Sequence, residues 1–324
     1  MTGLTLAATI ESWPLAEPFV IARGSKREAR VIVVHVSNGR VSGRGECVPY
    51  PRYGETPETT LREILAVPPV LDRPRLNAAL PASAARNAID CAMWDLEAKR
   101  AGRRASDLAG VGDLRPLVTC YTLSLDTPEV MASKARAVAR LPLLKLKLGG
   151  DGDAARMRAV RAARPDARLV ADANEAWQPE MLEPLLEVAA ETRIELIEQP
   201  LPAGYDAALA ACRRRVPVCA DESVHTSKEL VELRDRYDAV NIKLDKAGGL
   251  TEALAMAGEA RRLGFRIMVG CMVATSLAMA PALVVAQSAD WVDLDGPLLL
   301  ARDCPFGLEI RDGIIAPPDP RLWG

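Results

Sequence analysis

The chain has 324 residues, enough for one barrel-sized domain and a smaller companion, and its 49% hydrophobic and 26% charged residues are typical of a globular protein. Its 41 Lys and Arg residues against 43 Asp and Glu residues leave a net charge of −2. Because there is no basic surplus to hold a nucleic-acid backbone or an acidic membrane surface, we expect neither as a partner.

The cysteines and the N-terminal residues bear on the cellular compartment in which the protein works. Seven cysteines are scattered along the chain without a C-x-x-C pair, which argues against a disulfide framework and against a zinc site. The N-terminus lacks a basic segment followed by an apolar core, and no apolar run is long enough to span a bilayer. We therefore expect a cytoplasmic protein.

Residues 1–115 have the pattern of a small α+β capping domain. Strands are predicted at residues 4–13 and 27–37, with a third within residues 39–50 that pairs with the second across the S-N-G-R turn. An amphipathic helix is predicted over residues 83–102.

Two polar stretches of this domain, residues 21–29 and 49–55, are predicted as loops because they are rich in turn-forming residues. They carry Arg23, Tyr50 and Tyr53. Loops of this kind could close over a ligand.

Residues 116–296 alternate short apolar runs with segments of helical spacing, such as residues 179–191. The eight runs are LVTCYTLSL, LLKLKL, RLVADAN, IELIEQPL, VPVCADES, AVNIKLDK, RIMVGCM and WVDLDG. This rhythm favours a parallel α/β barrel over an open sheet, although periodicity alone leaves the open sheet available. The tail at residues 297–324 is broken by Pro and Gly, and we expect it to pack back on the first domain.

Charged residues end most of these runs, at the edge of a barrel where active sites lie. They are Lys147, Asp172, Glu198, Asp221, Lys243 and Asp293. A single lysine or aspartate at such a place is usually solvated or caps a helix. A succession of them in a packed barrel must be paired or must hold a ligand.

Three acids, Asp172, Glu198 and Asp221, follow successive strands and should converge on one side of the barrel mouth. Three carboxylates suit a hard cation, and Mg²⁺ binds such oxygens at about 2.0–2.1 Å while keeping positions for water or substrate. The chain has only two histidines, which leaves few ligands for a softer metal. We expect Mg²⁺.

Lysines flank the acids on both sides. Lys145 and Lys147 alternate with leucines and should share the interior face, with Lys243 across the mouth. Repulsion between neighbouring ammonium groups and a dication should make one lysine a usable base for removing a proton beside a carboxylate. Lys246 competes with Lys243 for this role, but we place Lys246 in a turn outside the site.

The chain resembles the enolase superfamily, in its muconate-lactonizing-enzyme branch, and within it the dipeptide epimerases that act on L-Ala-D/L-Glu. The resemblance covers essentially the whole chain. It is carried by the segments PFVIARGS, GECVPYPRYGE, ARNAIDCAMWDLEAKR, KLKL, VADANEAW, IEQPLP, CADES, VNIKLDKAGGLTEALAMA, GCM and DLDGP.

The resemblance implies a modified TIM barrel, (β/α)₇β, whose α+β capping domain is formed by the N-terminal region and the C-terminal tail. It assigns Lys147 and Lys243 as the acid/base pair, and it makes Lys145 an assistant at the substrate carboxylate. The Mg²⁺ ligands would be Asp172, Glu198 and Asp221. Asp293 and Asp295 would receive the free ammonium group of a dipeptide, and Arg23 would pair with an acidic side chain on its second residue.

The function implied is epimerisation of L-Ala-D/L-Glu, a peptidoglycan fragment, by two-base proton transfer through an enediolate. Dipeptide epimerases of other specificity stay open, as do o-succinylbenzoate synthase and N-succinyl-amino-acid racemase, although two carboxylates aimed at an ammonium group argue against the last two. A Schiff-base aldolase is another class of enzyme, which the three aligned acids disfavour. A barrel that only binds an acidic peptide is the non-catalytic alternative. The sequence leaves the oligomeric state open, with a homo-oligomer allowed.

Overall fold

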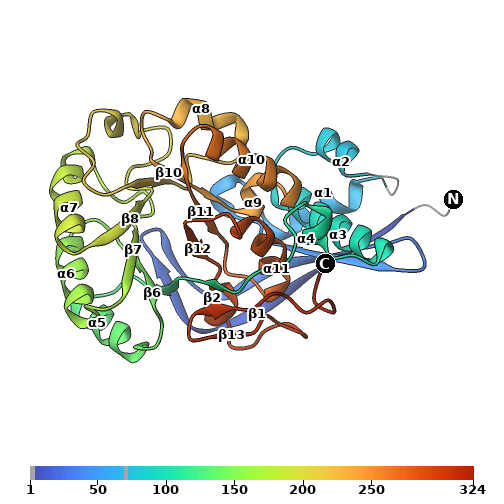
Figure 1. The fold of residues 1–324 in the computed structure, drawn as a ribbon, viewed down its shortest axis with the longest axis horizontal. Helices are drawn as coiled ribbons and strands as arrows, with labels where there is room; N and C mark the ends of the chain where they lie inside the picture. The colour runs from blue at the N-terminus through green and yellow to red at the C-terminus, as the bar shows by residue number, and fades with distance from the viewer. Residues whose placement is uncertain (1–3, 69–71) are drawn as a thin grey trace.

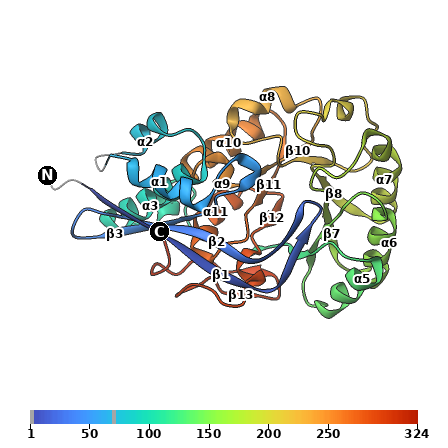
Figure 2. The same cartoon turned by 180° about the vertical axis from the view of Figure 1, so that it is seen from behind.

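The computed structural model describes residues 4–68 and 72–324 of the chain (Figure 1). An eight-stranded parallel sheet curls into a nearly closed barrel, and a three-stranded antiparallel sheet with its own helices lies beside it (Figures 1 and 2). The predicted α/β barrel with an α+β companion is confirmed. No helix in the described ranges is both long enough and apolar enough to cross a membrane.

The companion unit is built on an antiparallel sheet in the order β1-β2-β3. Its elements are β1 Thr5–Ile21, β2 Gly24–Ser37, β3 Ser42–Cys47, η1 Pro51–Tyr53, α1 Pro57–Ala66, α2 Arg73–Ala79, α3 Ala84–Ala101 and α4 Ala105–Leu108. Helix α3 begins where the Ser83 side chain accepts a hydrogen bond from Arg86 N and ends at Gly102 in a left-handed conformation. Strand β3 lies so close to α3 that a Cβ on Gly45 would be 2.1 Å from Ala88 O.

The hairpin of β1 and β2 differs from the sequence prediction. Residues 21–29 are not a loop, because β2 begins at Gly24 and only two residues separate it from Ile21 at the end of β1. A register shift between Pro14 and Phe19 interrupts the pairing, and the distal part of the hairpin reaches across to the barrel (Figure 2). The sequence signal for a strand is weak here because polar residues fill the outer half of the hairpin.

The barrel strands run in order from β5 to β12, and all of their pairings are parallel. They are β5 Tyr121–Leu123, β6 Leu143–Lys147, β7 Arg168–Asp172, β8 Ile194–Glu198, β9 Val218–Ala220, β10 Ala239–Ile242, β11 Arg266–Gly270 and β12 Trp291–Asp293. The first and last strands meet where Cys120 N donates a hydrogen bond of 2.8 Å to Val292 O.

Helices connect most of these strands on the outside of the barrel. They are α5 Pro128–Ala137, α6 Asp153–Ala163, α7 Pro179–Glu191, α8 Leu230–Leu233, α9 Leu244–Ala247, α10 Leu250–Arg262 and α11 Ser276–Ala286. The connection from β8 to β9 contains only the 3₁₀ turn η2 Ala207–Ala210; two further turns are η3 Ser227–Glu229 and η4 Gly296–Leu299. The arrangement is that of a (β/α)₇β barrel.

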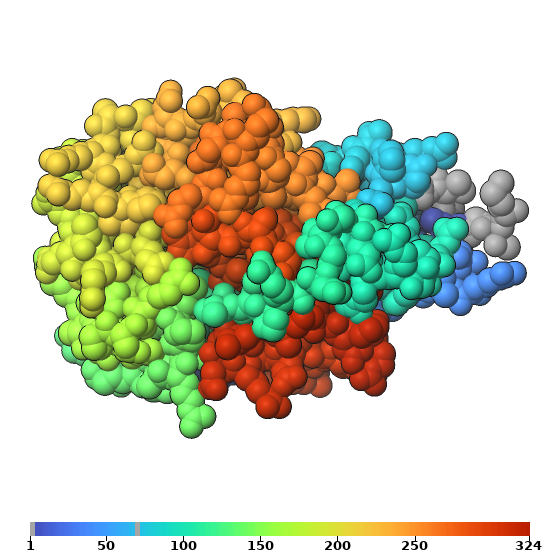
Figure 3. Space-filling model, in the orientation of Figure 1, coloured from blue at the N-terminus to red at the C-terminus, as the bar shows by residue number. Residues whose placement is uncertain are grey.

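The C-terminal tail contacts both units. Strands β13 Ile310–Arg311 and β14 Ile314–Ile315 form a small sheet with β4 Leu117–Val118. Strand β4 consists of the first two residues of the run LVTCYTLSL, so these two residues do not belong to the barrel. Further on, Trp323 Nε1 donates to Cys91 O at 3.0 Å, and the tail lies on the surface next to the segment of α3 and α4 (Figure 3).

The barrel interior is closed at one end by a layer of apolar side chains. Its members come one from each strand or its edge: Cys120, Leu143, Val170, Leu196, Cys219, Ala239, Met268 and Trp291. Because side chains on a strand alternate between faces, the residues two positions further along each strand also point inward, toward the other end of the barrel. That end is where the polar residues gather.

Candidate active site

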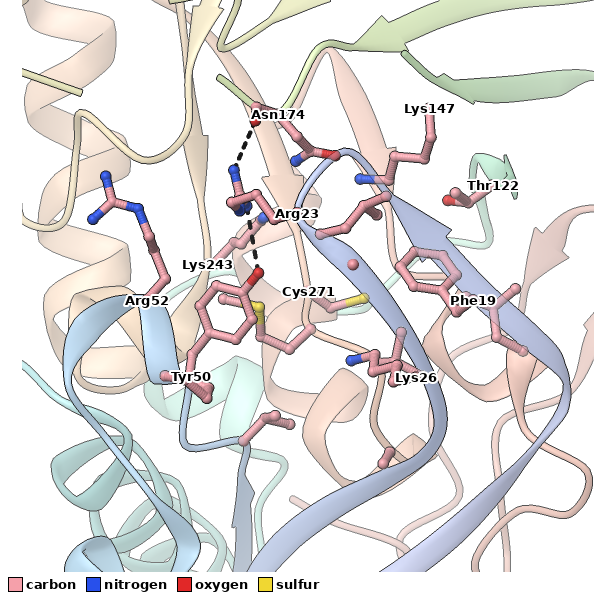
Figure 4. A pocket seen from close by; sticks show the side chains of 18 of the residues that line it. Phe19, Arg23, Lys26, Tyr50, Arg52, Thr122, Lys147, Asn174, Lys243 and Cys271 are labelled. Atoms are coloured by element: carbon pink, nitrogen blue, oxygen red, sulfur yellow. Dashed lines mark hydrogen bonds between the residues drawn. The ribbon is translucent and has the colours of Figure 1, made fainter. Parts of the chain in front are cut away.

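A cavity of about 760 Å³ lies between the carboxyl ends of the barrel strands and the companion unit (Figure 4). The β1–β2 hairpin lines it from Phe19 to Arg30, and residues 48–53 line a second side. Lys145, Lys147 and Lys243 line it from the barrel. Both polar stretches of the companion unit therefore cover the barrel mouth.

The next layer of inward-facing side chains, toward the carboxyl ends of the strands, is buried, polar and mostly charged. It consists of Lys145, Asp172, Glu198, Asp221, Asn241 and Asp293, each two residues beyond a member of the apolar layer. On β11 the equivalent position is Gly270, where a Cβ would lie 2.6 Å from Asn241 Oδ1. Glycine there leaves room for Asn241, whose Nδ2 donates to Glu198 Oε1 at 2.7 Å.

The three acids predicted as metal ligands lie on consecutive strand ends and are at most 2% exposed. Asp172 lies 2.6 Å from Lys147 Nζ, and Asp221 lies 2.6 Å from Lys243 Nζ. Glu198 Oε2 accepts no hydrogen bond from the described residues, although Lys145 Nζ is 2.6 Å away outside the hydrogen-bonding direction. Each acid thus has a lysine beside it.

These acids fit a hard cation by their chemistry. Burial and, to a smaller extent, the neighbouring Asp172 raise the pKa of Glu198 to about 7. Carboxylate oxygens are the ligands that Mg²⁺ prefers. No three His, Cys, Asp or Glu side chains in residues 4–68 and 72–324 form a ready-made set of metal ligands. Each of the three acids instead has a lysine Nζ at 2.6 Å.

The lysines lie where alternation predicts them, on the interior face of the barrel. Lys145 is 1% exposed, and its Nζ donates to Asp293 Oδ2 at 2.7 Å. Burial lowers the pKa of Lys145 and Lys243, but the adjoining carboxylates outweigh it and hold both pKa values well above the ordinary value. The carboxylates therefore dominate the surroundings of both lysines, and the expectation that a dication and a neighbouring ammonium group ease deprotonation of one lysine stays a prediction.

Lys246 does not lie in an outer turn, and this part of the prediction is wrong. It belongs to the one-turn helix α9 and is 2% exposed. Its Nζ contacts Asp221 Oδ1 at 2.6 Å and Asp221 O at 2.5 Å. Lys243 lines the cavity, whereas Lys246 lies outside the lining, behind Asp221. One helical turn separates the two lysines, which explains how both reach the same carboxylate.

Asp293 and Asp295 both line the cavity and are about equally buried. Asp295 Oδ2 accepts a hydrogen bond from Thr122 N at 2.7 Å, and burial together with Asp293 raises the pKa of Asp295 to about 7. Asp293 Oδ1 is buried and accepts no hydrogen bond from the described residues. This oxygen is available to a donor on a ligand.

Arg23 lines the cavity at the tip of the β1–β2 hairpin, but its guanidinium is already engaged. Nη2 donates to Glu222 Oε1 at 2.6 Å, and Nη1 donates to Glu175 Oε2 at 3.0 Å. Nη1 also donates to Asn174 O at 2.8 Å (Figure 4). Asn174 and Glu175 both have positive φ, 44° and 68°, so the turn that meets Arg23 is conformationally strained.

Several cavity residues escaped the sequence analysis. Glu222 directly follows Asp221 and Asn174 stands two residues after Asp172, and their position at strand ends was an available signal. Lys26 lines the cavity from β2, and no pattern in its polar surroundings distinguished it.

The chain matches two family models that together cover most of its length. Residues 4–110 match the mandelate racemase/muconate lactonizing enzyme N-terminal domain, and residues 130–321 match the enolase C-terminal domain-like family. The chain is 47% identical over 309 residues to the L-Ala-D/L-Glu epimerase of Escherichia coli (strain K12), covering 94% of this chain and 96% of that protein. It is 43% identical over 300 residues to an N-acetyl-D-glutamate racemase from Pseudoalteromonas sp, covering 91% and 95%.

Solved structures match over nearly the full length. An enolase family member from Agrobacterium tumefaciens, with homology to dipeptide epimerases and with bound sodium and L-Ala-L-Glu, superposes with a TM-score of 0.97 at 53% identity, covering 99% of this chain and 100% of that one. A dipeptide epimerase from Methylococcus capsulatus, complexed with Mg and L-Arg-D-Lys, superposes with a TM-score of 0.91 at 30% identity, covering 100% and 99%.

Proposed function

Because the chain belongs to the mandelate racemase and muconate lactonizing enzyme family of the enolase superfamily, and is an isomerase of the epimerase and racemase type, we propose that it interconverts L-Ala-D-Glu and L-Ala-L-Glu. The reaction proposed is Mg²⁺-dependent removal of the α-proton on one face of the glutamate residue and its return on the other face.

The observation that carries this proposal is the placement of Lys147 and Lys243. Their ammonium groups touch different carboxylates, those of Asp172 and Asp221, and both lysines line the same cavity from different strands (Figure 4). A planar intermediate needs one acid/base on each face of the α-carbon, and two opposed lysines meet this need. In this scheme each lysine removes the proton of one epimer and returns a proton to form the other.

Asp293 and Asp295 support a substrate with a free ammonium group. The unpartnered Asp293 Oδ1 can accept a hydrogen bond from that group, and Asp295 is one alternation step beyond it. Lys145, held at 2.7 Å from Asp293, is proposed to help neutralise the substrate carboxylate.

Asp172, Glu198 and Asp221 are the residues proposed to hold Mg²⁺. The bound cation would supply positive charge that stabilises the substrate carboxylate as negative charge develops on it. Solved relatives that contain sodium and L-Ala-L-Glu, or Mg and L-Arg-D-Lys, support this assignment.

A racemase of N-acylated glutamate is the second candidate, because a relative of that name is 43% identical. Its substrate would share the glutamate residue and lack the ammonium group. The two aspartates disfavour this candidate, since an acylated amine offers them no positive charge.

The setting proposed for the reaction is the cytoplasm, in recycling of peptidoglycan peptides. All seven cysteines, each in the described part of the chain, are free thiols, which suits a reducing compartment.

Incubation with Mg²⁺ and a dipeptide library in D₂O tests the proposal. Mass spectrometry should detect α-deuterium and inversion in L-Ala-Glu and little of either in N-acetylated analogues. Exchange confined to N-acyl glutamates would replace the proposal with the second candidate, and no exchange in any compound would contradict both.

A further inference from the structure

We propose that Asp245 is a positioning residue that fixes two parts of the site at once: the covering segment, residues 48–53, and the helical turn that carries Lys243. The second part of this role rests on the proposed function, since it takes Lys243 as an acid/base. Asp245 does not line the cavity, and the catalytic, metal and substrate assignments do not use it.

The carboxylate of Asp245 is bound by the companion unit. Its Oδ1 accepts a hydrogen bond from Val48 N at 3.0 Å and another from Asn87 Nδ2 at 2.8 Å. Asp245 belongs to the barrel, whereas Val48 directly follows β3 and Asn87 lies on α3. A single oxygen of the barrel therefore joins two segments of the companion unit.

Val48 is the first residue of the covering segment, and every residue of this segment lines the cavity. Pro49 and Pro51 have no backbone N–H to donate. The other amide hydrogen bonds that the segment makes with the described residues stay within residues 50–55. The hydrogen bond from Val48 N to Asp245 therefore anchors the backbone of the segment to the barrel at the point where it leaves the sheet.

Asp245 is also part of the turn that carries Lys243. It belongs to the one-turn helix α9, which begins directly after Lys243. The carbonyl oxygen of Lys243 accepts hydrogen bonds from Lys246 N at 3.0 Å and Ala247 N at 2.9 Å, so the lysine and the helix form one hydrogen-bonded turn. Helix α3 holds the far end of this turn, because Arg86 Nη2 donates to Ala247 O at 2.6 Å. Asp245 holds the end at which Lys243 lies.

The two donors compensate for the burial of Asp245. Burial raises the pKa of Asp245 to about 7, and the hydrogen bonds from Val48 and Asn87 act in the opposite direction. An apolar side chain in place of Asp245 leaves the buried amide of Val48 without its acceptor, which is unfavourable, so the covering segment and the turn should both shift. Asparagine keeps an oxygen that can accept both hydrogen bonds.

The kinetic test measures α-hydrogen exchange of L-Ala-Glu in D₂O in full-length variants that keep one lysine. In Lys147→Ala the remaining base is Lys243. Adding Asp245→Leu to it should slow exchange about 10- to 100-fold at saturating substrate, the scale of a small misplacement of a reacting group, whereas adding it to Lys243→Ala should slow exchange at least about tenfold less. KM should rise in both backgrounds, because the covering segment shifts in both. Asp245→Asn should restore most of the loss, and equal slowing in the two backgrounds would overturn the link to Lys243.

Asp238→Leu is the matched control. Asp238 lies at the opposite end of β10, where its Oδ2 accepts a hydrogen bond from Val218 N at 2.9 Å. The control removes an aspartate that binds a backbone amide next to the same strand, away from the cavity lining. It should lower the unfolding temperature as Asp245→Leu does and leave exchange unchanged in both backgrounds. Selective slowing by Asp238→Leu in the Lys147→Ala background would show that general destabilisation is the cause, and would overturn the proposal.

Backbone hydrogen–deuterium exchange separates this inference from the proposed function, because it needs no turnover. In Asp245→Leu with both lysines intact, amide exchange in peptides that cover residues 48–53 and 243–247 should rise at least about tenfold, while Asp245→Asn and Asp238→Leu keep it slow there. A rise confined to Asp245→Leu supports the anchoring role, even if the unmodified protein epimerises nothing and the proposed function fails. Unchanged amide exchange in Asp245→Leu contradicts the role of Asp245, whether or not epimerisation occurs.

Discussion

Lys147 and Asp172 are register partners on the neighbouring strands β6 and β7, and Lys147 Nζ lies 2.6 Å from Asp172 Oδ2. On the far side of Glu198, Lys243 Nζ lies at the same distance from Asp221 Oδ2. The acid cluster is therefore bounded by one lysine at each end.

Removal of the metal should abolish turnover. Chelation should stop epimerisation and added Mg²⁺ should restore it, because the substrate carboxylate must be neutralised as the proton leaves. Glu198→Gln keeps the size of the side chain and removes one proposed ligand charge, and it should cost roughly 100-fold or more in kcat. Circular dichroism should show that this variant is folded. Full activity in thoroughly chelated protein would refute the metal assignment.

Asp293 should set the requirement for a free amine. Asp293→Asn removes the carboxylate that offers an unpartnered oxygen to the cavity, so KM for L-Ala-L-Glu should rise about 10- to 100-fold. The variant should also discriminate less against N-acetyl-L-Ala-L-Glu. Steady-state kinetics on both compounds measures this, and an unchanged preference for the free amine would remove Asp293 from the site.

Lys246 should behave as a positioning residue. It holds both the side chain and the carbonyl of Asp221, so Lys246→Met should destabilise the fold by about 1–3 kcal/mol, because Asp221 loses two hydrogen bonds but keeps Lys243 as a partner. Denaturant unfolding measures this. Exchange in D₂O should fall for both epimers alike; loss for one epimer alone would make Lys246 an acid/base in place of Lys243.

Glu46 should give the protein a pH-dependent stability. Glu46 is 2% exposed at the contact with Thr275, and burial raises its pKa from 4.5 to about 8. The folded state thus binds the Glu46 proton more tightly than the unfolded state does. The contribution of Glu46 to the free energy of unfolding therefore falls as the pH rises from 4.5 to about 8.

Glu46→Gln removes this titration and should flatten the loss of stability by up to about 1.4 kcal/mol per pH unit in that window. Urea unfolding at several pH values measures the slope, with Glu63→Gln as the exposed control that should not alter it. Parallel pH profiles for Glu46→Gln and the unmodified chain would show that Glu46 is ionised throughout.

The sequence alone predicted the place of a side chain wherever that place follows from a short-range rule. Alternation placed Lys145 and Lys147 inside, and the β/α rhythm put Asp172, Glu198 and Asp221 at neighbouring strand ends, because parallel strands present their carboxyl ends to one edge. The prediction of a loop at residues 21–29 rested on their turn-forming residues and is wrong, because these polar residues form the paired outer end of the hairpin, from Phe19 opposite Lys26 to Ile21 opposite Gly24.

Contacts between segments far apart in the chain could not be predicted from the sequence. Arg23 donates to Glu222, which lies 199 positions further along the chain, and only the folded structure shows that this guanidinium is already paired. The burial of Lys246 likewise depends on the chain forming a one-turn helix directly after β10, where the sequence suggested a turn.

The central claim is that Lys147 and Lys243 serve opposite faces of the α-carbon, and single-lysine variants in D₂O test it most directly. Each variant keeps one base, which can remove and return a proton on its own face. Lys147→Ala should therefore exchange the α-hydrogen of one epimer of L-Ala-Glu without inverting it, and Lys243→Ala should do so for the other epimer. Mass spectrometry combined with chiral separation distinguishes exchange from inversion. Appreciable inversion by either variant, or exchange of the same epimer by both, would contradict the two-lysine account.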